Sequence, residues 1–300
     1  MIFPDKISDV NNILEPEINR LFDLALKKQA DNGDLLLMYA NGFYYKDPTD
    51  ESINPHVIGL SSEGHSELAH CSFIDKYRSI FISKYTLSEY LKLHEYSQEK
   101  KEEIDRLVDF EEMTIQLEML IYLKFWEADM IIKKLYQFVR ILSGEHYDWY
   151  FKIKESNRDT DATDSRQELI RVKIRNALKD ISSIICNLIE STYKTQIRNS
   201  IAHSNYSFVG RNIHLNNYIK NDPASPLISI SFDEWINIFH NTLALHNQYI
   251  SLNNKINEYY IKQASESENS IHILITEESG KQYNHPLIMH NGRWIYKPNY

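Results

Sequence analysis

The sequence predicts a mainly helical protein with small β additions in its N-terminal region and its C-terminal tail. Turn residues are scarce, because the 300 residues include only 8 Gly and 8 Pro. Residues 98–142 contain neither type, which favours long helices over many short strands. Apolar residues also recur at helical spacing in several stretches. We therefore expect a mixed α/β region at 1–100, a helical bundle at 101–262 and a small β-meander at 263–300.

The N-terminal region carries signals for both helices and strands. Residues 16–30 predict a helix with Pro16 near its first turn. Asn41-Gly42 separates two apolar runs, and because both residues tolerate positive φ, the dipeptide predicts a β-hairpin. Thr86 and Glu89 have the spacing of a capping box, which predicts the start of a short helix.

The central part of the chain predicts three helices. The first is apolar on most sides over 117–139, as in the centre of a bundle, and is expected to end at Ser143-Gly144. A capping box at Ser165-Arg166-Gln167-Glu168 opens the second, an amphipathic helix running to about Gln196. The third begins at Ser231-Phe232-Asp233-Glu234.

Short strands are expected elsewhere in the C-terminal half. Ile213–Leu215 and Leu227–Ile230 are strand candidates between the second and third helices. From Ile271 the tail predicts a β-meander, with turns at Ser279-Gly280 and Asn291-Gly292.

Charge and composition exclude several classes of protein. A formal net charge of −9 argues against coating nucleic acid through bulk electrostatics, although it leaves room for a local basic groove. Cys71 and Cys186 lack paired spacing and indicate reduced thiols. The first residues lack the pattern of a signal peptide, and no stretch approaches the roughly eighteen apolar residues of a membrane span. We therefore expect a cytoplasmic protein with no membrane partner.

The run at 198–203, Arg-Asn-Ser-Ile-Ala-His, combines residue types suited to phosphodiester cleavage. Histidine exchanges protons near neutral pH, and arginine holds a phosphate and stabilises charge in the transition state. On a helix Asn199 and His203 share a side, whereas Arg198 and His203 diverge by about 140°. The two could still converge through the long arginine stem, a frayed helix end or a second copy of the chain. An exposed arginine beside a helix-capping histidine is the structural alternative.

The run resembles the signature of the HEPN superfamily, in which Arg and His are separated by four to six residues, the first of them polar, at the end of a helix in a bundle. The resemblance covers roughly 105–260, including the central apolar helix and the return to a helix at Phe232-Asp233-Glu234-Trp235. It implies a HEPN-like helical bundle that forms a homodimer with a composite active site. By this resemblance Arg198 and His203 are catalytic, and Asn199 has the supporting role.

The resemblance also implies an activity. Members of this kind are metal-independent endoribonucleases, in which the 2′-OH of RNA attacks the adjacent phosphate and leaves a 2′,3′-cyclic phosphate and a 5′-OH. The requirement for RNA has a physical reason, because without a metal to make hydroxide the 2′-OH of the substrate is the available nucleophile.

Several residues are candidates for supporting this site. Glu127 and Asp129 lie in the most apolar helix, where an ionised carboxylate needs a partner. By the same resemblance an acid on a neighbouring helix orients the basic groups of the site, and either residue is a candidate for that role. An ion pair of Asp129 with Lys133 on the helix surface is the structural interpretation. Tyr206 is placed to stack on a base or to pack in the core.

A basic run on the second helix offers a local track for RNA, or simply a solvated face. Its members are Arg166, Arg171, Lys173, Arg175, Lys179 and Lys194.

Arg140 and His146 form an alternative site, because their spacing also fits the HEPN signature. Ile141 follows this arginine and Ser143-Gly144 breaks the helix between the two, so packing of His146 at a bundle corner is the competing interpretation.

Other chemistry lacks its usual motifs. No histidines have metal-ligand spacing, and the sequence contains neither a Gly-rich phosphate loop nor a Gly-x-Ser-x-Gly elbow. We therefore expect no metal and no cofactor.

The leading hypothesis is a ribonuclease of toxin or antiviral defence type, with RNA as substrate and an antitoxin or regulatory protein as partner. The N-terminal region and the β tail are expected to control it. Two alternatives stay open: a HEPN-like module that binds RNA, a nucleotide or a protein without cleavage, and a subunit of a larger defence complex.

Overall fold

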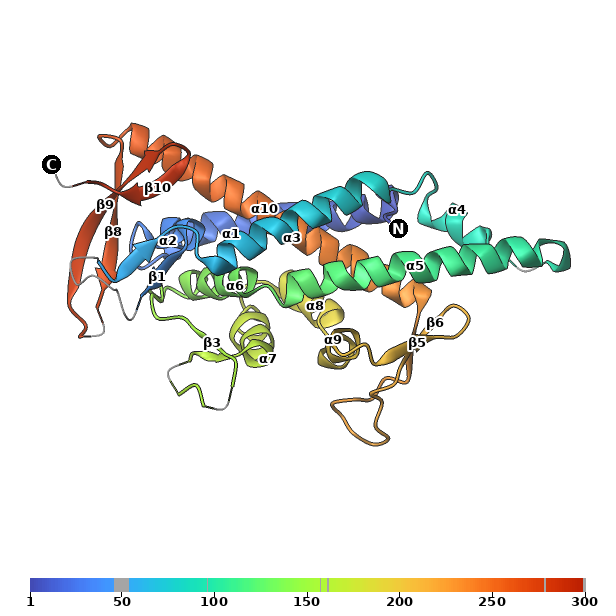
Figure 1. Ribbon diagram of the computed structural model, residues 1–300. Coiled ribbons are helices and arrows are strands. Elements are labelled where there is room, and N and C mark those ends of the chain that lie inside the picture. The colour runs from blue at the N-terminus through green and yellow to red at the C-terminus, as the bar shows by residue number, and fades with distance from the viewer. Residues whose placement is uncertain (46–53, 96, 157, 161, 278, 299–300) are drawn as a thin grey trace. The chain divides into compact units, whose positions relative to one another are not determined.

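The structure is a computed structural model that describes residues 1–300 except 46–53, 96, 157, 161, 278 and 299–300. It is mainly helical with several small sheets, as the sequence predicts (Figure 1). The chain divides into two compact units of three segments each. Unit 1 comprises Met1–Glu15, Leu68–Ala128 and Ile184–Gln248; unit 2 comprises Pro16–Glu67, Asp129–Ser183 and Tyr249–Tyr300. The expected boundaries near residues 100 and 262 stay a prediction.

Three helices are divided between the two units, and apart from Ser183, the first residue of α8, each remaining element belongs to one unit. The shared helices are α1 (Pro4–Lys28), α3 (Ser62–Ile80) and α10 (Phe232–Ser265). The other elements of unit 1 are α4 (Leu87–Lys92), the short 3₁₀ helix η1 (Gln98–Lys100), α5 (Lys101–Trp126), α8 (Ser183–Thr192), α9 (Thr195–Ala202), β5 (Tyr206–Phe208), β6 (Asn212–Leu215) and β7 (Ser229–Ser231).

The core of unit 1 is rich in aromatic side chains. Tyr122 and Trp126 of α5 are buried with Trp235 of α10, and the rings of Tyr122 and Trp235 lie 5.8 Å apart. Glu118 is also buried, and it accepts hydrogen bonds from Trp235 Nε1 and from the hydroxyl of Tyr77, both at 2.8 Å. These bonds offset the cost of burying a carboxylate.

Unit 2 combines helices with two small sheets and a parallel ladder. Its other elements are α2 (Asp34–Ala40), β1 (Gly42–Tyr44), β2 (His56–Ile58), α6 (Asp129–Leu142), β3 (Ile153–Lys154), β4 (Asp164–Ser165), α7 (Arg166–Glu168), the π-helix η2 (Leu169–Asn176), β8 (Ser270–Thr276), β9 (Gln282–His290) and β10 (Arg293–Tyr296). Strands β8, β9 and β10 form an antiparallel meander that contacts α2 and β2 (Figure 1). The predicted β tail is confirmed, with Gly280, Asn291 and Gly292 at positive φ in its turns.

The expected hairpin at Asn41-Gly42 is wrong. Leu35 to Ala40 belong to helix α2, and Asn41, at φ 57°, is the C-cap of that helix. Gly42 opens β1, which pairs with β2 instead. A short buried apolar run has no periodicity that separates a strand from a helix, and an Asn at positive φ serves a helix end as well as a hairpin.

The three helices predicted in the central part of the chain exist, but the first two are interrupted. The helix predicted at 16–30 exists too, and it starts earlier, at Pro4. The apolar helix breaks between α5 and α6 at Glu127 and Ala128 and ends before Ser143-Gly144, as predicted. The second consists of α7, η2, α8 and α9. Pro16 lies inside α1 rather than in its first turn. The capping box expected at Thr86 is formed, and at Ser165 the side chain accepts from the N–H of Glu168 at 3.3 Å. Ser231 and Glu234 form a further capping box at the start of α10.

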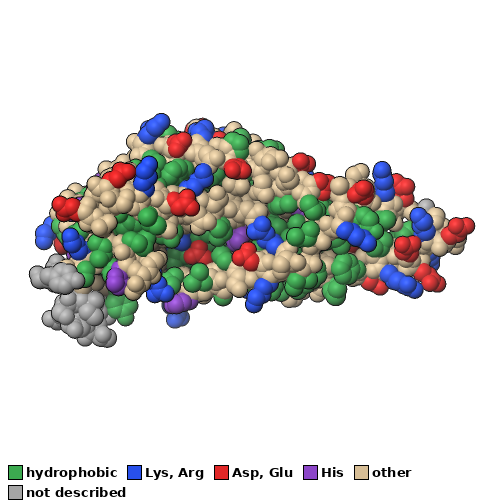
Figure 2. Space-filling view, turned by 90° about the horizontal axis from the view of Figure 1, so that it is seen from above, with side chains coloured by type: hydrophobic (Ala, Val, Ile, Leu, Met, Phe, Trp, Pro, Cys, Tyr) green, Lys and Arg blue, Asp and Glu red, His purple; other side chains and the backbone are tan. Residues whose placement is uncertain are grey.

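None of the described helices is both long and apolar enough to cross a lipid bilayer. On the face shown in Figure 2, Lys and Arg side chains are interspersed with Asp and Glu side chains.

Candidate functional site

Helix α9 carries the run at 198–203 and packs against α5 within unit 1. Ile197 and Ile201, one turn apart, are both buried. The break before α9 is bridged by Tyr122, whose hydroxyl donates to the carbonyl of Thr192 at 3.1 Å and accepts from the N–H of Lys194 at 3.4 Å. Burial raises the pKa of Tyr122, so this hydroxyl stays protonated and able to donate. The helix is thereby held on the core of unit 1 through Ile197 and Ile201.

Arg198 lies between an acid from α5 and its own neighbour in α9. Its Nε forms an ion pair with Oε1 of Glu127, the C-cap residue of α5, and its Nη1 donates to Oδ1 of Asn199 at 2.8 Å. The two paired atoms are shielded from solvent, although the side chains of Arg198 and Glu127 are 20% and 31% exposed. A guanidinium has five N–H donors, and these two contacts use only Nε and Nη1. Among the described residues no contact is made by Nη2, so this nitrogen can bind an anion.

His203 is the C-cap of α9, and its side chain is exposed. The N–H of Asn205 bonds to the carbonyl of Ser200 at 2.8 Å, and the N–H of Ser204 bonds to that of Ile201 at 3.1 Å. This pair of bonds is a Schellman motif, and Ser204 takes the left-handed conformation it requires, at φ 52°. The imidazole therefore projects from a helix end with a defined backbone.

The site thus assembles in part within one chain. Arg198 contacts both Asn199 and Glu127, whereas no hydrogen bond or ion pair joins Arg198 to His203 within the described part of the chain. This agrees with the divergence of about 140° expected for residues five apart on a helix.

Tyr206 and Lys194 flank the run on either side. Tyr206 opens β5, is half-buried and packs edge-on against Phe208, with ring centroids 5.7 Å apart. Burial raises the pKa of Tyr206. Lys194 is the exposed N-cap residue of α9.

The ion pair of Asp129 with Lys133, the structural interpretation of these two residues, is not formed. Asp129 instead accepts two hydrogen bonds from Arg166, at 2.8 and 3.0 Å, within unit 2. Lys133 is buried and donates to Oδ1 of Asn41 at 2.8 Å and to the carbonyl of Gly42 at 2.7 Å. Helix spacing does not reveal these partners, which come from segments distant in sequence. Of the two candidate acids, Glu127 is the one that contacts the motif arginine.

Arg140 and His146, the alternative site, contact each other through the backbone. Arg140 donates from Nε and Nη2 to the carbonyl of His146, at 3.3 and 3.1 Å, and pairs with Glu145 at 2.7 Å. The ring of His146 lies 4.0 Å from Asp34, whose pKa burial raises to about 6. These contacts favour a structural role for the pair.

The basic run is divided between the two units. Arg166 to Lys179 belong to unit 2, and Lys194 belongs to unit 1 with the motif. Arg171, Lys173 and Lys179 are exposed, whereas Arg166 binds Asp129 and Arg175 donates to Asn176. Its role as an RNA track stays a prediction.

Two residues that position α9 could not be predicted from the sequence. Gln196 acts through its buried side chain, and Ser204 acts through its left-handed backbone conformation. Neither has a sequence signal, since Ser seldom adopts positive φ and Gln is mostly exposed.

The chain is without a match among protein-family models, curated proteins and solved structures. No three His, Cys, Asp or Glu side chains are grouped to hold a metal ion among the described residues. The HEPN resemblance therefore depends on the run at 198–203 and its flanks.

Proposed function

We propose that the C-terminal end of α9 is the active site of a metal-independent endoribonuclease of the HEPN type. The observation that carries the proposal is the placement of Arg198, which a carboxylate and an amide hold at the end of the helix that His203 caps. Held in this way, the arginine loses little conformational freedom when it binds a phosphate.

The proposed reaction assigns one role to each residue. The 2′-oxygen of RNA bonds to the adjacent phosphorus, and the bond from phosphorus to the 5′-oxygen breaks. Imidazole takes the proton of the 2′-OH and returns a proton to the leaving 5′-oxygen. Arg198 stabilises the charge that develops on the phosphoryl oxygens. Asn199 and Glu127 are positioning residues, because they act through Arg198.

A composite site between two copies of the chain completes this proposal. Arg198 and His203 diverge in one chain, so in a dimer with facing motifs Arg198 of one copy and His203 of the other act on the same phosphate. We further propose a role in toxin or antiviral defence, with an antitoxin or regulatory protein as partner.

A second candidate function is binding without cleavage. Two N–H donors of Arg198 are already engaged by Glu127 and Asn199. The net charge of −9 also weakens non-specific attraction of the protein to RNA. A HEPN-like module that binds RNA, a nucleotide or a protein fits these two facts.

The product ends distinguish the two functions. Purified protein incubated with RNA in EDTA is expected to yield fragments with 2′,3′-cyclic phosphate and 5′-OH ends. Activity that needs a divalent metal, or fragments with 5′-phosphate ends, would exclude the proposed reaction. Retained RNA with no product across several RNA classes would favour the binding module.

A further inference from the structure

The segment between β6 and β7 is a compact loop whose two ends are bonded to the site helix. Gln196, in the first turn of α9, is buried. Its side-chain amide donates to the carbonyl of Leu227 at 2.7 Å and accepts from the N–H of Leu227 at 2.9 Å. Its backbone carbonyl accepts from Nδ2 of Asn217 at 2.9 Å. One residue of α9 therefore holds both ends of loop 217–227.

The loop is ordered by its own turns. The N–H of Ile219 bonds to the carbonyl of Ser225 at 3.2 Å, and the N–H of Asp222 bonds back to that of Ile219 at 3.1 Å. Asn221 supplies the left-handed residue, at φ 65°. A surface loop with close ends and internal bonds is an Ω-loop, a type that often carries function.

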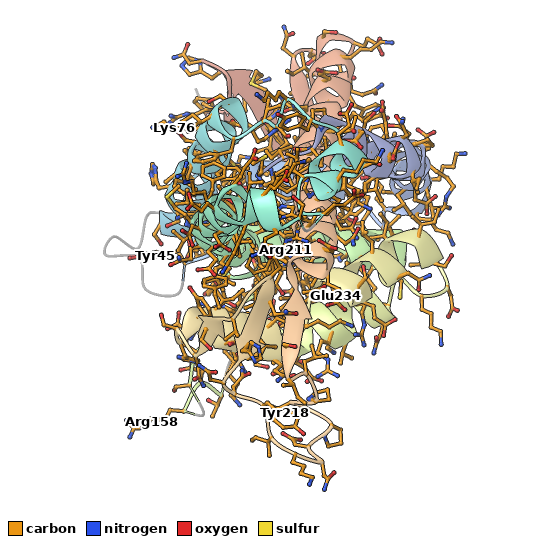
Figure 3. All side chains as sticks on the ribbon, turned by 90° about the vertical axis from the view of Figure 1, so that its right-hand side faces the viewer. Tyr45, Lys76, Arg158, Arg211, Tyr218 and Glu234 are labelled. Carbon is orange, nitrogen blue, oxygen red and sulfur yellow. The ribbon has the colours of Figure 1, made fainter. Side chains whose placement is uncertain are left out.

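Loop 217–227 presents an aromatic side chain to solvent. Tyr218 is 37% exposed, and within the described residues no other aromatic ring contacts it, in contrast to Tyr206. Figure 3 shows Tyr218 on the loop that extends beyond the strands of unit 1. The loop has one Lys and one Asp, at 220 and 222, so it does not add to the acidic charge that repels RNA.

The base of the loop is adjacent to the C-cap of α9. The carbonyl of Asn205 accepts the N–H of Asn216 at 3.0 Å, and the N–H of Tyr218 donates to the carbonyl of Leu215 at 3.1 Å. Asn205 is two residues after His203 and Asn216 is two before Tyr218, so the Cα atoms of His203 and Tyr218 lie within about 20 Å. A few nucleotides of single-stranded RNA span such a distance.

We propose that loop 217–227 binds an unpaired nucleobase, stacked on Tyr218, of the RNA strand whose phosphate lies at the end of α9. The inference rests on the proposed function, since it assumes RNA at that site. It makes single-stranded RNA the substrate class, because bases in a duplex are already stacked and do not offer a free face.

RNA binding by full-length variants tests the loop separately from cleavage. All proteins carry His203→Ala, so that the probe, a fluorescein-labelled single-stranded oligoribonucleotide of mixed sequence, stays intact. Tyr218→Ala is expected to raise the Kd about tenfold, since stacking on one aromatic ring contributes that much, whereas Tyr218→Phe stays within about twofold. Tyr45→Ala, an exposed tyrosine of unit 2 that Figure 3 also labels, is the matched control and should not change the Kd.

Each outcome decides the inference. Equal affinity of the Tyr218→Ala and parent proteins for the oligoribonucleotide would overturn it, while RNA cleavage by the wild-type chain would leave the proposed function intact. An equal loss with Tyr45→Ala would overturn it too, because stacking would then not be specific to the loop. No RNA binding by the parent, together with no cleavage by the wild type, would contradict both proposals. If Tyr218→Ala binds RNA as well as its parent does but no longer binds a protein partner of the parent, the loop binds that partner and the inference is overturned.

Discussion

At the scale of single residues, the contact between Glu127 and Arg198 determines how the site arginine is held. Its paired atoms are shielded from solvent, so the interaction is stronger than that of an ordinary surface ion pair. A double-mutant cycle of Glu127→Gln and Arg198→Met is expected to show a coupling energy of about 1 kcal/mol in urea unfolding. The same cycle on Glu102 and Arg106, an exposed pair on α5, should give no measurable coupling. Equal coupling in the two cycles would show that Arg198 is not held.

Lys133 makes the stability of the protein depend on pH. Burial lowers its pKa from 10.5 to about 7 in the folded chain, so the unfolded chain binds more protons between these two values. Stability contributed at this position therefore rises with pH above about 7, and it falls as pH decreases toward 7. Compared with Lys133→Met, the wild type should gain about 2 kcal/mol in unfolding free energy from pH 7 to pH 9. Urea titrations of the two proteins at both pH values measure this, and a constant difference would contradict the lowered pKa.

At the scale of elements, the end of α9 depends on the left-handed conformation of Ser204. A β-branched residue is strained there and glycine is not, so the expected order of stability is Ser204→Gly, then wild type, then Ser204→Val. The valine variant should lose about 1–2 kcal/mol in urea unfolding. Ser207→Val, on strand β5 with ordinary backbone angles, is the control and should be nearly neutral. A Ser204→Val protein as stable as the wild type would mean that the Schellman motif does not form.

Elements with local signals could be predicted from the sequence, and those set by distant contacts could not. The capping boxes at Thr86 and Ser231 and the glycine turns of the tail require only neighbouring residues. The break before α9 is bridged by Tyr122, seventy residues from Thr192. The break between η2 and α8 is held by Arg20, which donates to the carbonyl of Ile181 at 2.7 Å. Neither of these two breaks contains Pro or Gly, so no local residue type predicts it.

For the candidate site, the sequence predicts which residue types act but not what holds them. The run at 198–203 provides Arg198 and His203, and helical spacing predicts that these two side chains diverge. The choice between Glu127 and Asp129 was open in the sequence, because both follow the same apolar stretch. It depends on where α5 ends, and Glu127 rather than Asp129 caps that helix.

At the scale of the whole molecule, a composite site predicts that two inactive variants restore each other. Arg198→Ala chains and His203→Ala chains are mixed in equal amounts and refolded together. With random pairing, half of the dimers contain one chain of each variant. Each mixed dimer retains one complete Arg–His pair, so activity should return to about a quarter of the wild-type level. Each variant alone is the control and should stay inactive. A mixture as inactive as its components would contradict the composite site.

The central claim is that the run at 198–203, and not the pair Arg140 and His146, cleaves RNA. The most direct measurement compares RNA cleavage in EDTA by wild type, His203→Ala and His146→Ala at equal concentration. Loss of the proton-exchanging group should lower the rate at least about a hundredfold for His203→Ala, whereas His146→Ala should cleave at close to the wild-type rate. Equal cleavage by His203→Ala and the wild type, or loss of activity in His146→Ala alone, would contradict the account.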